Sequence, residues 1–346
     1  MQLVLHPAQR KHAPRSYLSA GSLLPHPEQP ERIDALQNGA QEAGLELTEP
    51  KDCGTGPIAA IHSAEYISFL ETIHARWRKI PGSSEEVIPN IHPDSREASY
   101  PSSAIGQAGF HQADCSCPIS SETWTSAYWS AQSAIAGARR VIGGGSAYAL
   151  CRPPGHHAFA DLAGGFCYFN NSAISAQIFC EAGLRPAIID VDLHHGNGTQ
   201  GIFYSRSDVL TVSVHRDTSN YYPHFWGYAH ERGAGCGLGM NLNLPLAGGT
   251  GDAGFLDALQ LGLKRVLSFG AQSLVVALGL DAYAGDPFGG LAVTTEGFAR
   301  IGGAIAKLSL PTLIVQEGGY LCGGLSQNLT AFLSAFLDCR KNRIQI

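Results

Sequence analysis

The feature that most constrains the fold is the alternation of short β-branched runs with longer segments of helical period. The short apolar runs predict strands at residues 147–150, 187–193, 209–214, 273–279 and 312–316. The longer segments predict helices at residues 125–142, 171–182, 256–269, 296–308 and 325–338. Because strands that alternate with helices are typical of βα units, the pattern predicts an α/β fold with a parallel sheet.

Residues 76–118 interrupt this alternation. The segment is polar and rich in Pro, Ser and His, and it has no sustained hydrophobic period. A long loop inside a compact domain usually has a function or contacts a partner, although a disordered surface excursion is the alternative. We therefore expect one domain, residues 1–346, with a long loop insertion at about 76–118.

Composition narrows the cellular setting and the partners. The formal net charge of −6 and the absence of a Lys/Arg block argue against nucleic acid or an anionic membrane surface as the main partner. No apolar run approaches the roughly 18 residues that span a bilayer, and the first residues do not resemble a signal peptide. Nine cysteines without framework spacing indicate a reducing compartment. These observations predict a cytoplasmic protein.

The stretch DVDLHHGNG, residues 190–198, concentrates ionisable groups directly after an apolar run. Side chains alternate in a strand, so Asp190, Asp192 and His194 are expected on one face. Asp192 and His194 can reach one cation, and these donors suit Zn²⁺ or a related divalent ion. Asp190, one pleat deeper, suits a carboxylate that orients a histidine or binds a different cation.

Three further strands are followed by groups with the same kind of chemistry. Asp281 follows one apolar strand, a Pro-Gly turn delivers His156 and His157 after another, and a diglycine turn carries Tyr320 after a third. All of them follow carboxyl ends of predicted parallel strands, where α/β folds place their sites. Asp281 would complete a site of two carboxylates and one imidazole with an open position, which is typical of a catalytic metal.

Four motifs, RPPGHHA, DVDLHHGNGTQ, GLDAYAGDP and QEGGY, resemble those of the zinc-dependent histone deacetylase family over nearly the whole chain. HPEQPERI, GGFCYFNN and the long loop are most similar to the acetylpolyamine amidohydrolase branch of that family. The resemblance implies an arginase/deacetylase-like three-layer fold, in which helices cover both faces of a central eight-stranded parallel sheet. It also implies one Zn²⁺ per chain and hydrolysis of a linear amide.

Amide hydrolysis requires a general base, a donor to the oxyanion and an acid for the amine, beside a metal that polarises the carbonyl. His157 is the expected base and later the acid, with His156 as an electrostatic partner oriented by Asp190. Tyr320 is the expected oxyanion donor. Asn197 stands where some family members have an aspartate, so His157 is expected to be less strongly driven toward its charged form.

The resemblance extends to residues around this centre. It implies substrate-binding roles for Gly165, Phe166, Tyr222 and Phe288 at the tunnel wall, and for Arg32 in an internal channel. It implies a structural monovalent cation, K⁺, at Asp190, Asp192, His194, Ser213 and Val214. It also implies a second monovalent cation at backbone carbonyls near Phe203, Arg206 and Val209.

Substrate choice is less constrained by the sequence. Ile105, Ser116 and Phe288 occupy points where the polyamine branch can carry carboxylates, and Asp114 is the nearest acid. We expect deacetylation of acetylpolyamines or similar small acetylated amines by a homodimer formed through the 76–118 loop. An acyl-lysine deacylase, a hydrolase of another small amide and a non-catalytic metal-binding protein are the alternatives.

Overall fold

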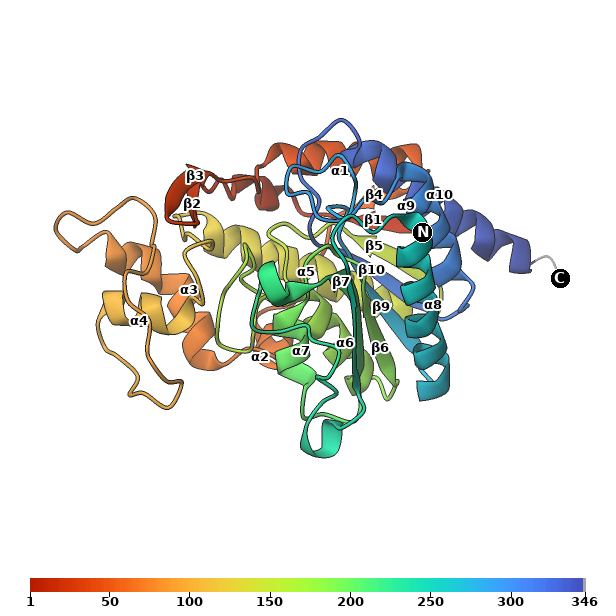
Figure 1. The fold of residues 1–346 in the computed structure, drawn as a ribbon. Coiled ribbons are helices and arrows are strands. Elements are labelled where there is room, and N and C mark those ends of the chain that lie inside the picture. Colours follow the sequence, from red (N-terminus) through yellow and green to blue (C-terminus); the bar gives the residue numbers. More distant parts are fainter. Residues whose placement is uncertain (345–346) are drawn as a thin grey trace.

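A single eight-stranded sheet forms the centre of the computed structural model, which describes residues 1–344 and the side chains of residues 1–341. All its strand pairs are parallel, in the order β4-β1-β5-β10-β9-β6-β7-β8 (Figure 1). The predicted eight-stranded parallel sheet is therefore confirmed. Its strands are β1 Gln2–Val4, β4 Glu46–Thr48, β5 Ser146–Ala149, β6 Pro186–Asp190, β7 Leu210–Arg216, β8 Asn241–Leu246, β9 Ser273–Leu278 and β10 Thr312–Gln316.

Helices cover both faces of the sheet, and each face has its own apolar core (Figure 1). Ile314 of β10 belongs to one core and its neighbours Leu313 and Val315 to the other, because successive strand side chains point to opposite faces. The Ile314 face packs against α1 (Glu31–Glu42), α8 (Asp252–Phe269), α9 (Thr295–Ala306) and α10 (Leu325–Ile344). The opposite face packs against α3 (Ala64–Trp77), α5 (Thr123–Ile142) and α6 (Asn171–Glu181).

Shorter elements connect these layers. A separate antiparallel hairpin is formed by β2 and β3. The short elements are η1 Pro7–Lys11, β2 Ser16–Ser19, β3 Ser22–Pro25, α2 Gly56–Ala59, α4 Ala104–His111, α7 Asn197–Phe203, η2 Thr218–Asn220 and η3 Gly235–Gly237.

The predicted strands and helices are all present, with shifts at their ends. The prediction for 187–193 is wrong at its carboxyl end, because β6 ends at Asp190. The Asp190 carboxylate accepts a hydrogen bond from the Asp192 amide at 3.0 Å, and this local turn competes with further strand pairing. Helix α8 begins at Asp252, before the predicted 256, where Asp252 also binds the amide and hydroxyl of Thr294.

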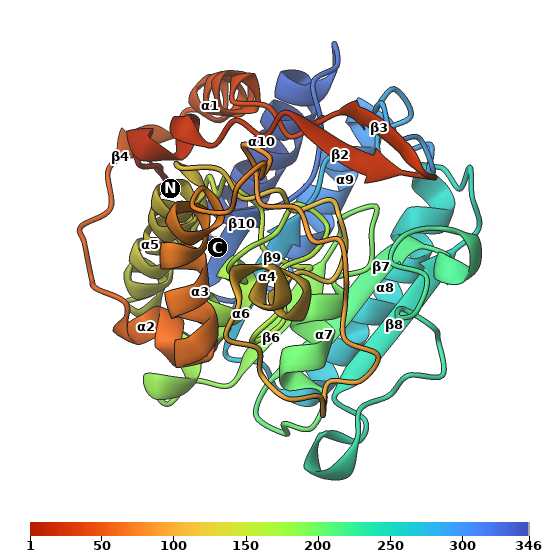
Figure 2. The ribbon, with the colours of Figure 1, turned by 90° about the vertical axis from the view of Figure 1, so that its left-hand side faces the viewer.

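The 76–118 segment is not structureless. It begins in the last residues of α3 and contains α4, whose first turn is capped by the Ser103 hydroxyl at 3.0 Å from the Gly106 amide. Figure 2 shows this segment crossing the front of the molecule. Single bridges from Val87 to Ile119 and from Gln112 to Ala163 tie it to the rest of the chain. The eight residues of α4 are too few to show a sustained period in the sequence.

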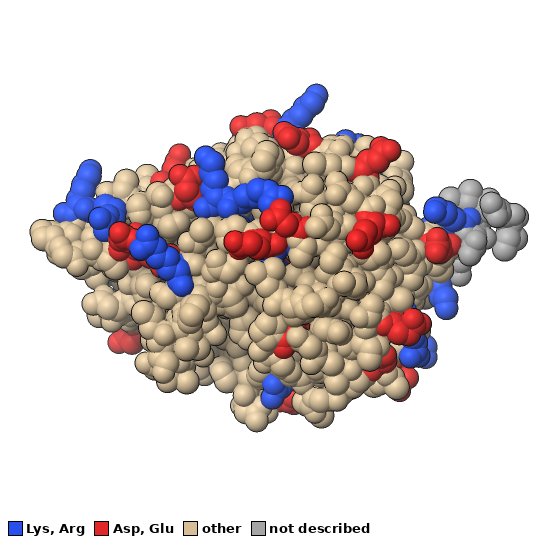
Figure 3. Space-filling view, turned by 90° about the horizontal axis from the view of Figure 1, so that it is seen from above, with Lys and Arg blue, Asp and Glu red and all other residues tan. Residues whose placement is uncertain are grey.

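The surface carries mixed charge. On the face shown in Figure 3, Lys and Arg side chains are interspersed with Asp and Glu, and wide areas between them carry neither. Within residues 1–344, none of the helices combines the length and the apolar character that a membrane span requires.

Candidate active site

A cavity of about 920 Å³ lies at the carboxyl edge of the sheet. The chain brings together at its wall most of the residues that the sequence singled out: His156, His157, Gly165, Phe166, Asp192, His194, Tyr222, Phe288 and Tyr320. Asp190, Asp281 and Arg32 are buried behind this wall. Groups far apart in the sequence therefore meet at one site, as the parallel sheet requires.

Asp192, His194 and Asp281, which we call the ligand cluster, are buried and their ligand atoms lie within 4.8 Å of one another. Nδ1 of His194 is 3.3 Å from Oδ1 of Asp192 and 3.1 Å from Oδ2 of Asp281. Two carboxylates and an imidazole at this spacing fit the donor set of Zn²⁺ or a similar divalent ion.

The backbone around the ligand cluster leaves room for it and orients its carboxylates. A Cβ at position 318 would lie 2.4 Å from Oδ2 of Asp281 and 2.6 Å from Oδ2 of Asp192, so only glycine fits there. The Gly318 amide donates to Asp192 at 2.8 Å, and the Leu193 amide donates to Asp281 at 3.0 Å. These bonds hold the donor set in place through main-chain groups, which suits a preformed metal site.

The two adjacent histidines have different partners. Nδ1 of His156 donates to Oδ2 of Asp190 at 2.9 Å, and Nδ1 of His157 donates to Oδ1 of Asn197 at 2.7 Å. Burial opposes the charged form of His156, but Asp190 and Asp192 outweigh it and raise its pKa to about 10. Burial and the neighbouring imidazoles of His156 and His194 lower the pKa of His157 well below its usual value. The pair therefore consists of one charged and one neutral imidazole.

Tyr320 lies on the turn after β10 with only 4% of its surface exposed. Its amide donates to Oδ2 of Asp286 at 2.9 Å, and its ring packs against Phe288 at 4.6 Å and Phe166 at 6.0 Å between centroids. Burial raises the pKa of Tyr320 well above its usual value, so its hydroxyl remains a hydrogen-bond donor.

The backbone of Gly165 forms the cavity wall beside His157 and lies close to its ring. Gly165 has φ +50°, and a Cβ there would lie 2.4 Å from Cδ2 of His157 and 2.8 Å from the Tyr222 hydroxyl oxygen. Oδ2 of the half-buried Asp114 accepts hydrogen bonds from the Gly165 amide at 3.0 Å and from the Tyr222 hydroxyl at 2.8 Å. Asp114 thus fastens the 76–118 segment to the wall.

The residues expected to bind monovalent cations fall into two places. Ser213 lies beside Asp190 in the register of β6 and β7. Phe203 is the last residue of α7, and Arg206 and Val209 follow it in the connection to β7. The Phe203 carbonyl accepts a hydrogen bond from the Arg206 amide at 2.9 Å.

Sequence reasoning missed several buried charged residues around the site. Oε2 of Glu317 accepts hydrogen bonds from the amides of Gly155 at 2.7 Å and His156 at 3.0 Å, and Oε1 accepts one from the Ser172 hydroxyl at 2.9 Å. Its place in QEGGY, directly after a buried strand, could have identified it, because a buried carboxylate needs partners. Glu28 and Arg152, which form a buried ion pair at 2.7 Å, were missed as well.

Comparisons with known proteins agree with this architecture. The family described as "Histone deacetylase domain" matches residues 26–336, and the chain therefore belongs to the histone deacetylase family. It is 47% identical over 338 residues to an acetylpolyamine amidohydrolase of Burkholderia pseudomallei (strain 1710b), covering 97% of this chain and 98% of the relative. It is 40% identical over 331 residues to acetylpolyamine amidohydrolase 2 of Pseudomonas aeruginosa, covering 94% and 96%.

A solved structure is also closely similar. The crystal structure of the acetylpolyamine aminohydrolase from Burkholderia pseudomallei matches with a TM-score of 0.94 at 47% identity, over 97% of this chain and 98% of that one. The family and branch that the sequence motifs resemble are thus confirmed.

Proposed function

We propose that the chain is a single deacetylase domain, residues 1–346, which acts in the cytoplasm on acetylpolyamines or similar small acetylated amines. It is an amidohydrolase that cleaves the N-acetyl amide to acetate and a free amine. One observation supports this most directly: a histidine base, a tyrosine donor and a metal-type donor set open onto one cavity. The nearly full-length similarity to acetylpolyamine amidohydrolases supports the substrate class.

One Zn²⁺ is proposed at the ligand cluster, where it would act as a Lewis acid toward the amide carbonyl and a water molecule. K⁺ is proposed at a neighbouring site near Asp190, Asp192, His194, Ser213 and Val214. A second K⁺ is proposed at the carbonyls of Phe203, Arg206 and Val209. The second ion would be structural, because Phe203, Arg206 and Val209 do not line the cavity.

His157 moves the proton in the proposed reaction. Because Oδ1 of Asn197 accepts a hydrogen bond from Nδ1, the proton of the neutral ring lies on Nδ1 and Nε2 is free to accept another. Nε2 takes a proton from the attacking water and later delivers it to the departing amine. His156, paired with Asp190, supplies fixed positive charge beside it.

Tyr320 stabilises the charge that develops on the carbonyl oxygen by donating its hydroxyl hydrogen. The aromatic side chains of Phe166, Tyr222 and Phe288 line the cavity and suit the methylene chain of an amine substrate. With a substrate in the cavity, the same apolar walls would limit the water around the oxyanion and strengthen the hydrogen bond from Tyr320.

Turnover of acetylputrescine, acetylcadaverine, acetylspermidine and an acetyl-lysine peptide by the purified zinc protein tests the substrate class. Short acetylated amines should be preferred, whereas a preference for the peptide would favour an acyl-lysine deacylase. Tyr320→Phe should retain zinc and KM and lower kcat about 100-fold or more, because the lost hydroxyl serves the transition state. Tyr128→Phe, whose hydroxyl donates to Asp52 outside the cavity wall, is the control.

We also propose that the 76–118 segment forms a homodimer contact. Ile91 and Tyr100 are exposed at 60% and 44%, whereas Trp77 is buried against the chain's own core. Ile91→Asp combined with Tyr100→Asp should give a monomer in light scattering. A dimer of unchanged affinity in that variant would exclude this surface as the contact.

A further inference from the structure

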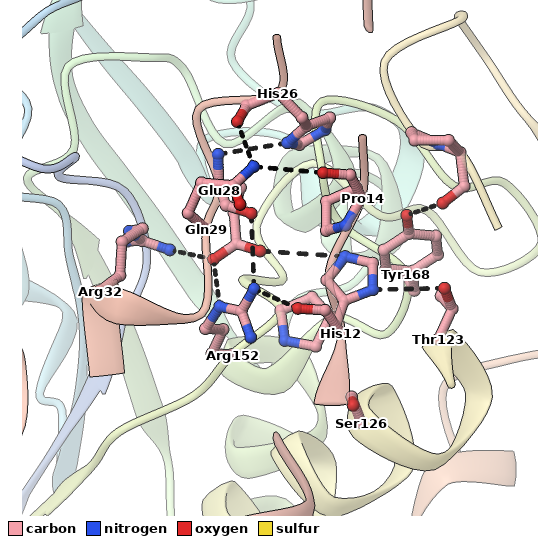
Figure 4. Close-up of polar contacts among 12 residues, drawn as sticks. His12, Pro14, His26, Glu28, Gln29, Arg32, Thr123, Ser126, Arg152 and Tyr168 are labelled. Atoms are coloured by element: carbon pink, nitrogen blue, oxygen red, sulfur yellow. Dashed lines mark hydrogen bonds and ion pairs between the residues drawn. The ribbon is translucent and has the colours of Figure 1, made fainter. Parts of the chain in front are cut away.

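Glu28 lies between the guanidinium groups of Arg32 and Arg152 (Figure 4). These two arginines contact the loops that leave the neighbouring strands β10 and β5. Glu28 is fully buried together with Arg32 and Arg152, and we call these three residues the Glu28 cluster. Neither the ligand cluster nor the cavity wall includes any of them.

The Glu28 cluster has two arms, Arg152 and Arg32. Arg152 belongs to the histidine loop, by which we mean residues 152–157 after β5. Nε of Arg152 donates to Oε1 of Glu28 at 2.7 Å, while Nη1 donates to the Gln9 carbonyl at 2.8 Å. Arg152 directly precedes the Pro153-Pro154-Gly155 turn that carries His156 and His157. Each proline fixes its own φ, so the turn is stiff. A displacement of the Arg152 backbone should therefore also displace His156 and His157.

Arg32, the second arm, reaches the tyrosine turn, by which we mean residues 317–320 after β10. Arg32 donates from Nη1 to Oε1 of Glu28 at 2.6 Å, from Nε to the Gly319 carbonyl at 2.6 Å and from Nη2 to the Glu317 carbonyl at 2.8 Å. Its guanidinium carbon lies 5.0 Å from the centroid of the Tyr320 ring. Arg32 therefore holds the backbone on which Tyr320 is carried.

Both arms end on the same carboxylate oxygen. Oε1 receives the two guanidinium donors, whereas Oε2 has no hydrogen-bond partner among the described residues and faces Nε2 of His12 at 3.8 Å. A rotation of the carboxylate that improves one bond must weaken the other, because hydrogen bonds depend steeply on angle. Burial favours the neutral acid, but Arg152 and Arg32 lower the pKa of Glu28 to about 2 and keep it ionised.

Glu317 links the same two loops a second time, without Glu28. Its side chain accepts the amides of Gly155 and His156, and its backbone carbonyl accepts Nη2 of Arg32. Contacts thus run from Glu28 through Arg152 to the histidine loop, across Glu317 to Arg32, and back to Glu28. The base and the oxyanion donor belong to one closed network.

We propose that Glu28 is a positioning residue that couples the histidine loop to the tyrosine turn and keeps the base and the oxyanion donor in register. This inference rests on the proposed function, since it assigns Glu28 a part in the geometry of that reaction. A misplacement of the order of 1 Å can slow catalysis about 100-fold, so a loose coupling would be visible in turnover.

The test is a cycle of Arg32→Lys, Arg152→Lys and the double variant, with kcat measured per bound zinc. Lysine keeps the charge but has no planar fork, so each single variant should lower kcat at least about tenfold with KM changed less than about threefold. The double variant should lose little more than the worse single variant, because both changes break one coupling. A loss equal to the product of the two single losses would show that the arms act independently and would overturn the proposal.

Glu28 itself is tested by Glu28→Gln and Glu28→Asp. Glu28→Gln should lower kcat at least about tenfold per bound zinc. Glu28→Asp keeps the charge between the guanidiniums and is the variant to use if the glutamine protein does not fold. Its shorter side chain cannot reach both arms, so it too should lower kcat while KM is maintained. Wild-type kcat in a folded Glu28 variant would refute the coupling.

Phe336→Leu is the matched control, because it truncates a fully buried residue of α10 and should lower the melting temperature with kcat unchanged.

Activity of the wild-type enzyme distinguishes failure of the proposed function from failure of the coupling. If it hydrolyses no acetylated amine, the proposed function fails. If it is active and the Glu28 variants match it, only the coupling fails.

Discussion

The ligand cluster and the Glu28 cluster are both buried and ionic, yet they are built in opposite ways. Asp192, His194 and Asp281 place two carboxylates beside one imidazole at a cavity, whereas Glu28 places one carboxylate between two guanidiniums inside the protein. A buried charge needs an opposite charge. The Glu28 cluster obtains that charge from the chain itself, whereas the excess carboxylate of the ligand cluster suits an incoming cation.

The largest expected effect follows from removing one arm of the ligand cluster. Asp281→Ala should abolish stoichiometric zinc and reduce turnover to background, because two donors no longer enclose the ion. Metal analysis of the purified protein measures this, with the exposed Asp338→Ala as control. Zinc retained at one ion per chain in Asp281→Ala would contradict the ligand assignment.

Urea denaturation of the metal-free protein should distinguish the two clusters. Glu28→Gln should lower the free energy of unfolding by about 3–5 kcal/mol, because two buried guanidiniums lose their counter-charge. Asp281→Asn should lower it by less than about 1 kcal/mol, since it relieves repulsion with Asp192 and keeps an acceptor for the Leu193 amide. Equal losses in the two variants would show that the clusters do not differ in this way.

A third effect concerns acid and the histidine that faces Glu28. Burial outweighs the attraction of Glu28 and lowers the pKa of His12 to about 3. Because the folded-state pKa is below the unfolded value near 6.5, stability is complete above pH 6.5 and is lost as the pH falls toward 3. His12 should therefore contribute a loss of about 2 kcal/mol between pH 7 and pH 5.

His12→Gln should remove that part of the pH dependence in urea titrations at the two pH values. His230→Gln, at an exposed position, is the control and should keep the wild-type dependence. If the His12→Gln protein loses as much stability as the wild type from pH 7 to pH 5, His12 is already charged in the folded state. Its charge would then be balanced by Glu28.

The smallest effect is expected at Asp114, a carboxylate of the cavity wall that belongs to neither cluster. In the described part of the chain, no arginine or lysine forms an ion pair with Asp114. Its carboxylate can therefore pair with an ammonium group of a substrate in the cavity. Asp114→Asn should lower kcat/KM for acetylputrescine about two- to fivefold relative to a neutral N-alkylacetamide, with a smaller difference at high salt.

Asp161→Asn provides the matched control, because Asp161 lines the same cavity but is already paired with Arg96. Its ratio of the two substrates should stay at the wild-type value. If Asp114→Asn leaves that ratio unchanged, or the wild type favours the cationic substrate more than a thousandfold, another carboxylate recognises the amine.

The parts of the fold and site that could be predicted are those with a strong local pattern. The run at 312–316 coincides with β10, and the spacing of Asp192 and His194 places both at the ligand cluster. The strand at 187–193 was predicted too long, because the Asp190 carboxylate turns the chain. Helix α4 was missed because so short a helix shows no sustained period.

The sequence by itself determined which chemical groups follow the strands, because hydrophobic runs and turn residues are local properties of the chain. It also determined the family, since its motifs are long and ordered. Only the tertiary structure decided that Glu28 meets Arg152 across 124 residues and that Arg32 reaches the Gly319 carbonyl across 287 residues. Those contacts depend on β5 and β10 being neighbours in the sheet, and strand order is set by the packing of the whole core rather than by any local period.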